Sequence, residues 1–145
     1  MINLEFSTLI DRPVSQVYAF LTDPLNLPRW QANVKDVKVV SPGAVGPGSA
    51  FDIASEMLGR RIEGRLEIVA MEPDQSFAFK MAAGPMQLQI KAGFKTVGTG
   101  TRLALNAQAE PGGLFKMAEG VLAGQVKSQM EANLARLKSV LESGA

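Results

Sequence analysis

The chain has 145 residues, and its 15 basic and 14 acidic side chains nearly balance. This length fits one domain, residues 1–145, and the balanced charge leaves no strong field to gather nucleic acid or an anionic membrane. The sequence contains no histidine and no cysteine, which excludes disulfides and imidazole or thiolate metal ligands. It also removes the side chains that most often do chemistry at neutral pH, so we expect no metal and no other cofactor.

The amino-terminal residues alternate between apolar and polar, which predicts a half-buried strand. Its inward positions are Leu4, Phe6, Thr8 and Ile10. The segment lacks the basic region and the apolar run of an export signal, and no stretch of the chain is apolar for long enough to span a bilayer. We therefore expect a cytoplasmic protein without stable membrane insertion.

Two short helices are expected to follow the first strand. Pro13 suits a first helical position, with Asp11 as a nearby cap, because proline fixes φ and lacks the N–H that would have no partner there. The first helix has one apolar face, formed by Val14, Val17, Tyr18 and Leu21. A second helix is predicted to begin at Pro24 and to end by Trp30, which places Trp30 where the helical layer meets a sheet.

Six further strands are predicted from runs of alternating or apolar residues that are separated by turn signals. The separators are rich in glycine and proline, which supply the conformations that tight turns need. Short connections of this kind favour antiparallel neighbours. The expected strands are Val34–Ser41, Ser49–Leu58, Arg61–Met71, Ser76–Ala82, Met86–Thr96 and Thr101–Gln108.

The alternation within these strands predicts a sheet with one apolar face and one solvated face. The inward side chains are Phe51, Ile53, Ser55, Met57, Ile62, Gly64, Leu66, Ile68, Phe77, Phe79, Met81, Met86, Leu88, Ile90, Phe94, Leu103, Leu105 and Ala107. The outward side chains include Arg61, Glu63, Arg65, Glu67, Gln87, Gln89 and Lys91. Cross-strand charge pairing is the expected role of the outward charges.

From about Gly112 to Glu142 the apolar residues recur every three or four positions, which predicts a long amphipathic helix. At 1.5 Å per residue this helix would run for about 40 Å, enough to cross the sheet. Gly120 and Gly124 interrupt its first half. We expect them to allow close packing, a bend or local opening.

The order of elements resembles the START-like (SRPBCC, helix-grip) superfamily, particularly the bacterial polyketide cyclase/dehydrase and lipid-transport group. Four segments carry the resemblance: RPVSQVYAFLTD with PRW, PGAVGPGSAF, VGTGTRLAL and NLARLKSVLE. The resemblance implies an α+β helix-grip fold: a seven-stranded curved antiparallel sheet with two short helices after strand 1 and a long C-terminal helix across the concave face. It also implies a cavity for hydrophobic small molecules that opens near the first half of that helix.

The leading hypothesis is a binding or carrier protein for a hydrophobic small molecule, such as a lipid, polyketide-like or aromatic compound. The expected ligand-binding residues are Trp30, Phe51, Ile53, Ser55, Leu66, Phe79, Met81, Leu88, Ile90, Phe115, Met117, Leu122 and Val126. No catalytic residue is predicted, because Ser55 has no histidine or lysine partner in the sequence pattern and Tyr18 is expected to pack in the core.

Two other functions stay open. A polyketide cyclase or dehydratase would need a buried polar cluster, for which Glu63, Arg65 or Asn106 would have to face the cavity. A protein-interaction module would show an exposed apolar patch. The sequence does not decide whether the chain forms a homodimer.

Overall fold

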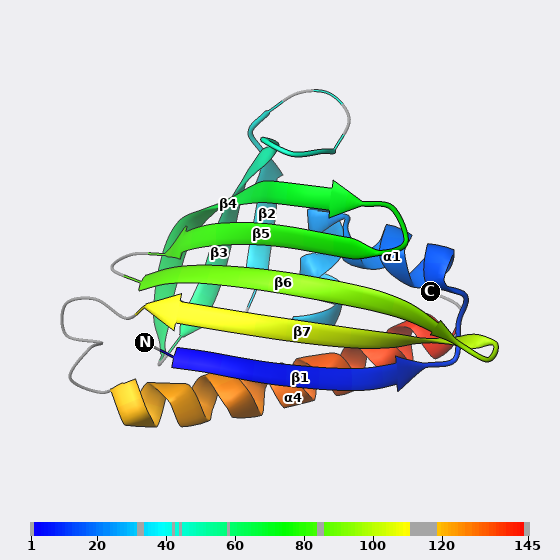
Figure 1. Cartoon of the computed structure of the whole chain (residues 1–145). Helices are drawn as coiled ribbons and strands as arrows, with labels where there is room; N and C mark the ends of the chain where they lie inside the picture. Colours follow the sequence, from blue (N-terminus) through cyan, green and yellow to red (C-terminus); the bar gives the residue numbers. More distant parts are fainter. Residues whose placement is uncertain are drawn as a thin grey trace.

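The computed structural model describes residues 2–31, 34–41, 43, 45–57, 59–83, 86–110 and 119–143, without the side chains of Met57, Ala83, Met86, Glu110, Glu119 and Leu122. Seven strands form one antiparallel sheet in the order β1-β7-β6-β5-β4-β3-β2 (Figure 1). Their bounds are β1 Ile2–Ile10, β2 Val34–Val39, β3 Ala50–Met57, β4 Arg60–Glu72, β5 Ser76–Ala83, β6 Met86–Val97 and β7 Gly100–Glu110. All seven predicted strands are confirmed, with ends that shift by up to two residues.

The helical layer between β1 and β2 consists of α1 (Val14–Leu21), a 3-10 turn η1 (Pro24–Asn26) and α2 (Leu27–Trp30). The α1 boundary differs from the prediction by one residue, because Pro13 occupies the N-cap position with an extended ψ of 148°. Asp11 does not cap α1, which has no side-chain cap. Asp23 does cap η1, where its carboxylate accepts a hydrogen bond from the backbone N–H of Leu25.

Inward side chains pair across the strands in continuous rows. In one row Phe77 of β5 lies opposite Ala92 of β6, which lies opposite Leu105 of β7, which lies opposite Phe6 of β1. Leu105 is 4% exposed and Leu103 is fully buried. The predicted inward alternation is therefore confirmed where side chains are described, and it gives the sheet a continuous apolar face.

The opposite face of the sheet is solvated and carries the predicted charge pairs. Arg65 of β4 contacts Asp52 of β3 with a nitrogen-to-oxygen distance of 3.1 Å, and Lys80 of β5 lies 3.7 Å from Glu67 of β4. All four side chains are about half exposed or more, so these pairs contribute little to stability.

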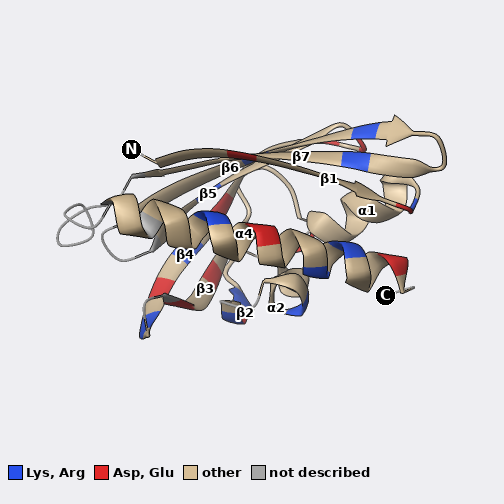
Figure 2. Cartoon of the chain, turned by 90° about the horizontal axis from the view of Figure 1, so that it is seen from below, with Lys and Arg blue, Asp and Glu red and all other residues tan. Residues whose placement is uncertain are grey.

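The long helix α4 (Glu119–Glu142) lies along β1 on the apolar side of the sheet, with α2 beside it (Figure 1). Lys127, Glu131 and Arg136 of α4 are exposed, and Figure 2 shows charged positions distributed along the ribbon of this helix. The predicted helix–sheet arrangement, an α+β helix-grip fold, is confirmed. The predicted helical residues 112–118 lie outside the described part of the chain. None of the described helices has both the length and the apolar character that crossing a membrane requires.

Candidate ligand-binding site

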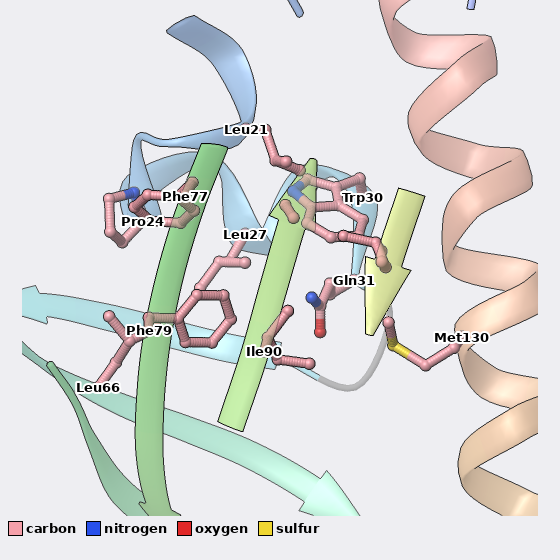
Figure 3. A pocket seen from close by; sticks show the side chains of 12 residues that line it. Leu21, Pro24, Leu27, Trp30, Gln31, Leu66, Phe77, Phe79, Ile90 and Met130 are labelled. Atoms are coloured by element: carbon pink, nitrogen blue, oxygen red, sulfur yellow. The ribbon is translucent and has the colours of Figure 1, made fainter. Parts of the chain in front are cut away.

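An apolar cavity lies between the helical layer, the inner face of the sheet and α4 (Figure 3). Leu21, Pro24 and Leu27 line it from the helical layer, and Met130 lines it from α4. The other lining residues are Trp30, Gln31, Leu66, Phe77, Phe79, Ile90, Ala92 and Leu105. None of these twelve residues is charged, so the interior suits neutral apolar matter.

The cavity offers about 20 Å³ to the centre of a water-sized sphere, which is room for roughly one water molecule. Pockets that hold a drug-sized ligand usually measure about 300–1,000 Å³. The interior is smaller than the resemblance implies because Trp30, Phe77 and Phe79 extend into it. A ligand of that size would therefore require the surrounding elements to move apart.

The packing of α4 shows where such a movement would meet least resistance. Between residues 120 and 129 no described side chain is buried, and Val121 is 66% exposed. The buried side chains of α4 begin at Met130 and are Met130, Asn133, Leu134, Leu137 and Leu141. A helical segment with few buried contacts opens at lower free energy than a well-packed segment.

Gly120 and Gly124 lie in this loosely packed half. A Cβ atom built at either position would meet no atom of the described residues within 4 Å. Because no described residue approaches these glycines, the described part of the chain does not favour close packing among the three expected roles. A bend or local opening stays a prediction. Their remaining effect is to weaken the helix itself, by roughly 1 kcal/mol each relative to alanine.

Several apolar residues around this half of α4 are only half-buried, among them Leu88 of β6 and Val126 of α4. Met81 of β5 lies opposite Leu88 in the sheet and is also half-buried. Leu88 and Val126 pack against one small cluster formed by Ile2 and Ala109. We call Met81, Leu88 and Val126 the mouth, because solvent reaches apolar side chains there.

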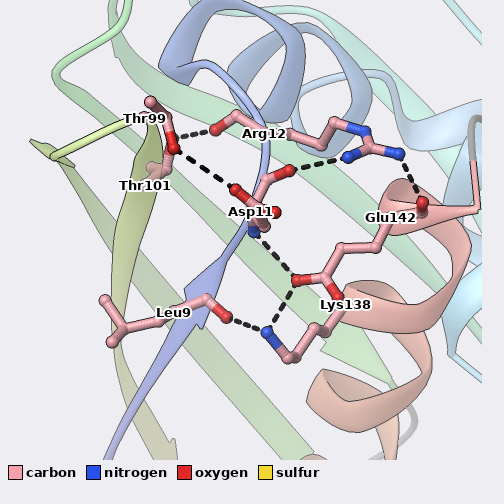
Figure 4. Close-up of polar contacts among 7 residues, drawn as sticks. All are labelled: Leu9, Asp11, Arg12, Thr99, Thr101, Lys138 and Glu142. Atoms are coloured by element: carbon pink, nitrogen blue, oxygen red, sulfur yellow. Dashed lines mark hydrogen bonds and ion pairs between the residues drawn. The ribbon is translucent and has the colours of Figure 1, made fainter.

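The other end of α4 is held by a polar cluster that we call the clasp: Asp11, Arg12, Lys138 and Glu142 (Figure 4). The Glu142 carboxylate accepts hydrogen bonds from the backbone N–H of Asp11 at 2.9 Å and from Lys138 Nζ at 2.6 Å. Arg12 donates to the backbone carbonyl of Glu142, and Lys138 donates to the carbonyl of Leu9 at 2.5 Å. The clasp fixes the carboxy-terminal end of α4 to the turn after β1.

The clasp predicts an acid-sensitive contribution to stability. The hydrogen bond from Lys138 and the one from the Asp11 backbone lower the pKa of Glu142 below its ordinary value. A carboxylate with a lowered folded-state pKa stabilises the fold above its unfolded-state pKa, and this contribution is lost as pH falls through the folded-state pKa. We expect Glu142→Gln to lower the urea midpoint at pH 7 and the difference from wild type to shrink below about pH 4.

The matched control is Glu131→Gln, which changes an exposed glutamate on the same helix. Its urea midpoint should follow that of the wild type at every pH. A Glu142→Gln deficit that stays constant from pH 7 to pH 3 would contradict the assigned role of the carboxylate.

The structure brings four of the predicted binding residues together around the cavity: Trp30, Leu66, Phe79 and Ile90. Three others, Met81, Leu88 and Val126, form the mouth. Phe51, Ile53 and Ser55 are buried on β3 and do not line the cavity. Phe115 and Met117 lie outside the described residues, as does the side chain of Leu122.

Most of the lining residues that were not predicted as ligand contacts lie at positions where the apolar periodicity predicts an inward side chain. Leu21, Phe77, Leu105 and Met130 belong to the predicted apolar faces. Ala92 lies between two inward residues of β6. Gln31 had no such signal, because a single polar residue after a short helix shows no periodicity.

The polar side chains that could serve a reaction have local structural roles. Ser55 Oγ lies 3.4 Å from the carbonyl oxygen of Ile62. Tyr18 donates to the carbonyl of Ser76 at 2.9 Å and packs edge-on against Phe94, with ring centroids 4.9 Å apart. Burial, reinforced by the charges of Asp74 and Glu72, raises the pKa of Tyr18, so its phenol holds its proton at neutral pH.

The residues that a cyclase would need inside the cavity lie elsewhere. Glu63 and Arg65 are exposed on the solvated face of β4. Asn106 of β7 donates to Asn3 of β1 on that same face, at 3.0 Å. Within the described ranges, no three carboxylates are arranged to hold a metal ion.

A curved sheet that grips a long carboxy-terminal helix over an apolar interior defines a START-like, helix-grip domain. A comparison with known protein families identifies the family within this class. The family model described as polyketide cyclase/dehydrase and lipid transport matches residues 1–142, and the chain belongs to this family. No curated protein matches the chain in sequence.

Solved structures share the fold at low sequence identity. An aromatase/cyclase, ZhuI, from a Streptomyces species is 14% identical with a TM-score of 0.77, over 97% of this chain and 93% of that protein. A protein from Thermus thermophilus is 20% identical with a TM-score of 0.75, over 99% of both chains. A START superfamily protein from Mycobacterium smegmatis is 13% identical with a TM-score of 0.73, over 99% of this chain and 96% of that protein. At these low sequence identities, the similarities establish a shared fold alone.

Proposed function

We propose that this protein binds a hydrophobic small molecule, such as a lipid, polyketide-like or aromatic compound, between the sheet and α4, and acts as its carrier. The observation that carries the proposal is the uncharged cavity that lies under a helix packed tightly at one end only. The membership in a family described by cyclase and lipid-transport activities is consistent with this class of ligand.

The proposed ligand would enter at the mouth and displace the first half of α4. Binding would then be driven by burial of apolar surface, at about 25 cal/mol per Å² before the costs of association and of moving the helix. Part of that surface is already exposed in the free protein, at Met81, Leu88 and Val126. A carrier needs this reversible opening, because a permanently sealed interior could neither load nor release its cargo.

The binding test uses the neutral dye N-phenyl-1-naphthylamine, which fluoresces strongly in apolar surroundings. We expect the wild type to bind it and Leu88→Glu to bind it about tenfold more weakly or worse, because a carboxylate at the mouth must be desolvated. Titration of the dye at pH 7 measures both affinities.

The matched control is Gln87→Glu, which adds the same charge to the adjacent residue on the solvated face of β6. It should bind the dye as the wild type does. Thermal unfolding of both variants separates a loss of binding from a loss of folding. Failure of the wild type to bind the dye, or equal binding by wild type and a folded Leu88→Glu variant, would overturn the proposed site.

A further inference from the structure

The indole N–H of Trp30 is a buried hydrogen-bond donor without a partner. Trp30 is 4% exposed, and its Nε1 atom has no hydrogen-bond acceptor among the described residues. Among the described residues, it is the one buried side-chain nitrogen or oxygen without a hydrogen-bond partner. Buried polar groups in folded proteins are almost always paired, so each exception calls for a physical reason.

The position of this donor suggests that reason. Trp30 lines the apolar cavity, and Figure 3 shows its ring nitrogen on the edge of the indole turned away from Met130. Of the other lining side chains, Gln31 is the one with amide hydrogen-bonding groups. A buried water molecule there would need two to four hydrogen-bond partners, and the side chains of this lining offer few such groups.

The lining also restricts the charge of any molecule that pairs with Trp30. None of the lining residues is a lysine or an arginine, so a carboxylate would be buried without a counter-ion. A neutral oxygen meets no such cost. A carbonyl on an apolar skeleton would satisfy the indole N–H and would cover the surrounding aliphatic and aromatic side chains.

We propose that Trp30 selects ligands that carry a neutral oxygen acceptor, such as a ketone or an ester, by donating its Nε1–H to that oxygen. This inference rests on the proposed function and specifies the ligand class for the same site. Pure hydrocarbons and carboxylate-bearing molecules are then the disfavoured classes.

The experiment compares two ligands of nearly equal shape, 2-acetylnaphthalene and 2-isopropenylnaphthalene, in which a carbonyl oxygen is replaced by a methylene group. Their affinities are measured by calorimetry for the wild type and for Trp30→Phe, which keeps an aromatic ring and removes the donor. The ratio of ketone to alkene affinity should fall about 3- to 10-fold in Trp30→Phe, the range expected for one hydrogen bond.

A second measurement needs no variant. Because Trp30 is the only tryptophan, the protein has a single indole N–H resonance in an ¹⁵N-correlated NMR spectrum. We expect 2-acetylnaphthalene to shift this resonance downfield and 2-isopropenylnaphthalene to leave its proton shift closer to that of the free protein. The downfield shift would support a hydrogen bond even if Trp30→Phe failed to fold.

The outcomes separate the two proposals. If both compounds bind with equal affinity ratios in both proteins and neither shifts the indole resonance downfield, the role of Trp30 is overturned while the apolar carrier stands. If neither compound binds the wild type and the neutral dye also fails, both proposals are overturned. A strong exchange cross-peak between the indole N–H and a bound water that persists with the ketone would likewise overturn the hydrogen bond.

Discussion

Leu137→Ala is expected to lower the free energy of unfolding by about 2–5 kcal/mol, the range for removing a buried leucine side chain. Leu137 is fully buried in the half of α4 that packs on the core. The removed side-chain atoms leave a cavity. The carboxy-terminal end of α4 cannot shift to fill it, because the clasp fixes that end. Urea denaturation followed by circular dichroism measures the loss.

Val126→Ala is the companion variant in the other half of the same helix. Val126 is half-buried, and alanine favours the helix more than valine does, so the loss should stay below about 1 kcal/mol. Equal losses at Leu137 and Val126 would show that α4 is packed uniformly. The proposed opening of its first half would then have no energetic basis.

Cross-linking the first half of α4 to β1 is expected to slow dye uptake about tenfold or more, because the path that needs this movement is closed. Leu4 of β1 and Ala123 of α4 both pack against the Ile2 and Ala109 cluster. The chain has no cysteine of its own, so Leu4→Cys with Ala123→Cys creates a unique pair of thiols. A short thiol-specific reagent with an internal disulfide joins them, and stopped-flow fluorescence measures the uptake of N-phenyl-1-naphthylamine.

Reduction of the reagent's disulfide provides the control within the same protein, since it should restore uptake. Leu4→Cys alone, treated with the reagent, shows the effect of the modification without a bridge. Unchanged uptake in a fully cross-linked protein would mean that the ligand reaches the interior by another route, and the mouth formed by Met81, Leu88 and Val126 would lose its assigned role.

The residues lining the cavity illustrate how much of the site could be predicted. Leu66, Phe79 and Ile90 were predicted because apolar residues with the correct period must face inward. Trp30 was predicted because it ends the second helix where the helical layer meets the sheet. Phe51 and Ile53 have the same period and lie in the core without lining the cavity. Period alone assigns a residue to a face, and it does not assign the residue to a position along that face.

Gln31 and the clasp mark the limit of such prediction. Gln31 reaches the cavity because α2 ends beside the sheet, a matter of how two elements pack. Glu142 accepts a hydrogen bond from the backbone N–H of Asp11, 131 positions away in the chain. No local sequence pattern predicts that pair. Asp11 was instead predicted to cap α1, because a local rule considers only the neighbouring helix.

The amino-acid sequence by itself determined the strands, the inward face of the sheet, the helical layer and the amphipathic helix, because each follows from the local period of apolar residues and from turn chemistry. Only the tertiary structure decided the size of the cavity, the unpaired donor of Trp30 and the contrast between the two ends of α4. These depend on the distances between side chains that are remote in the chain, and such distances are set by packing all the elements together.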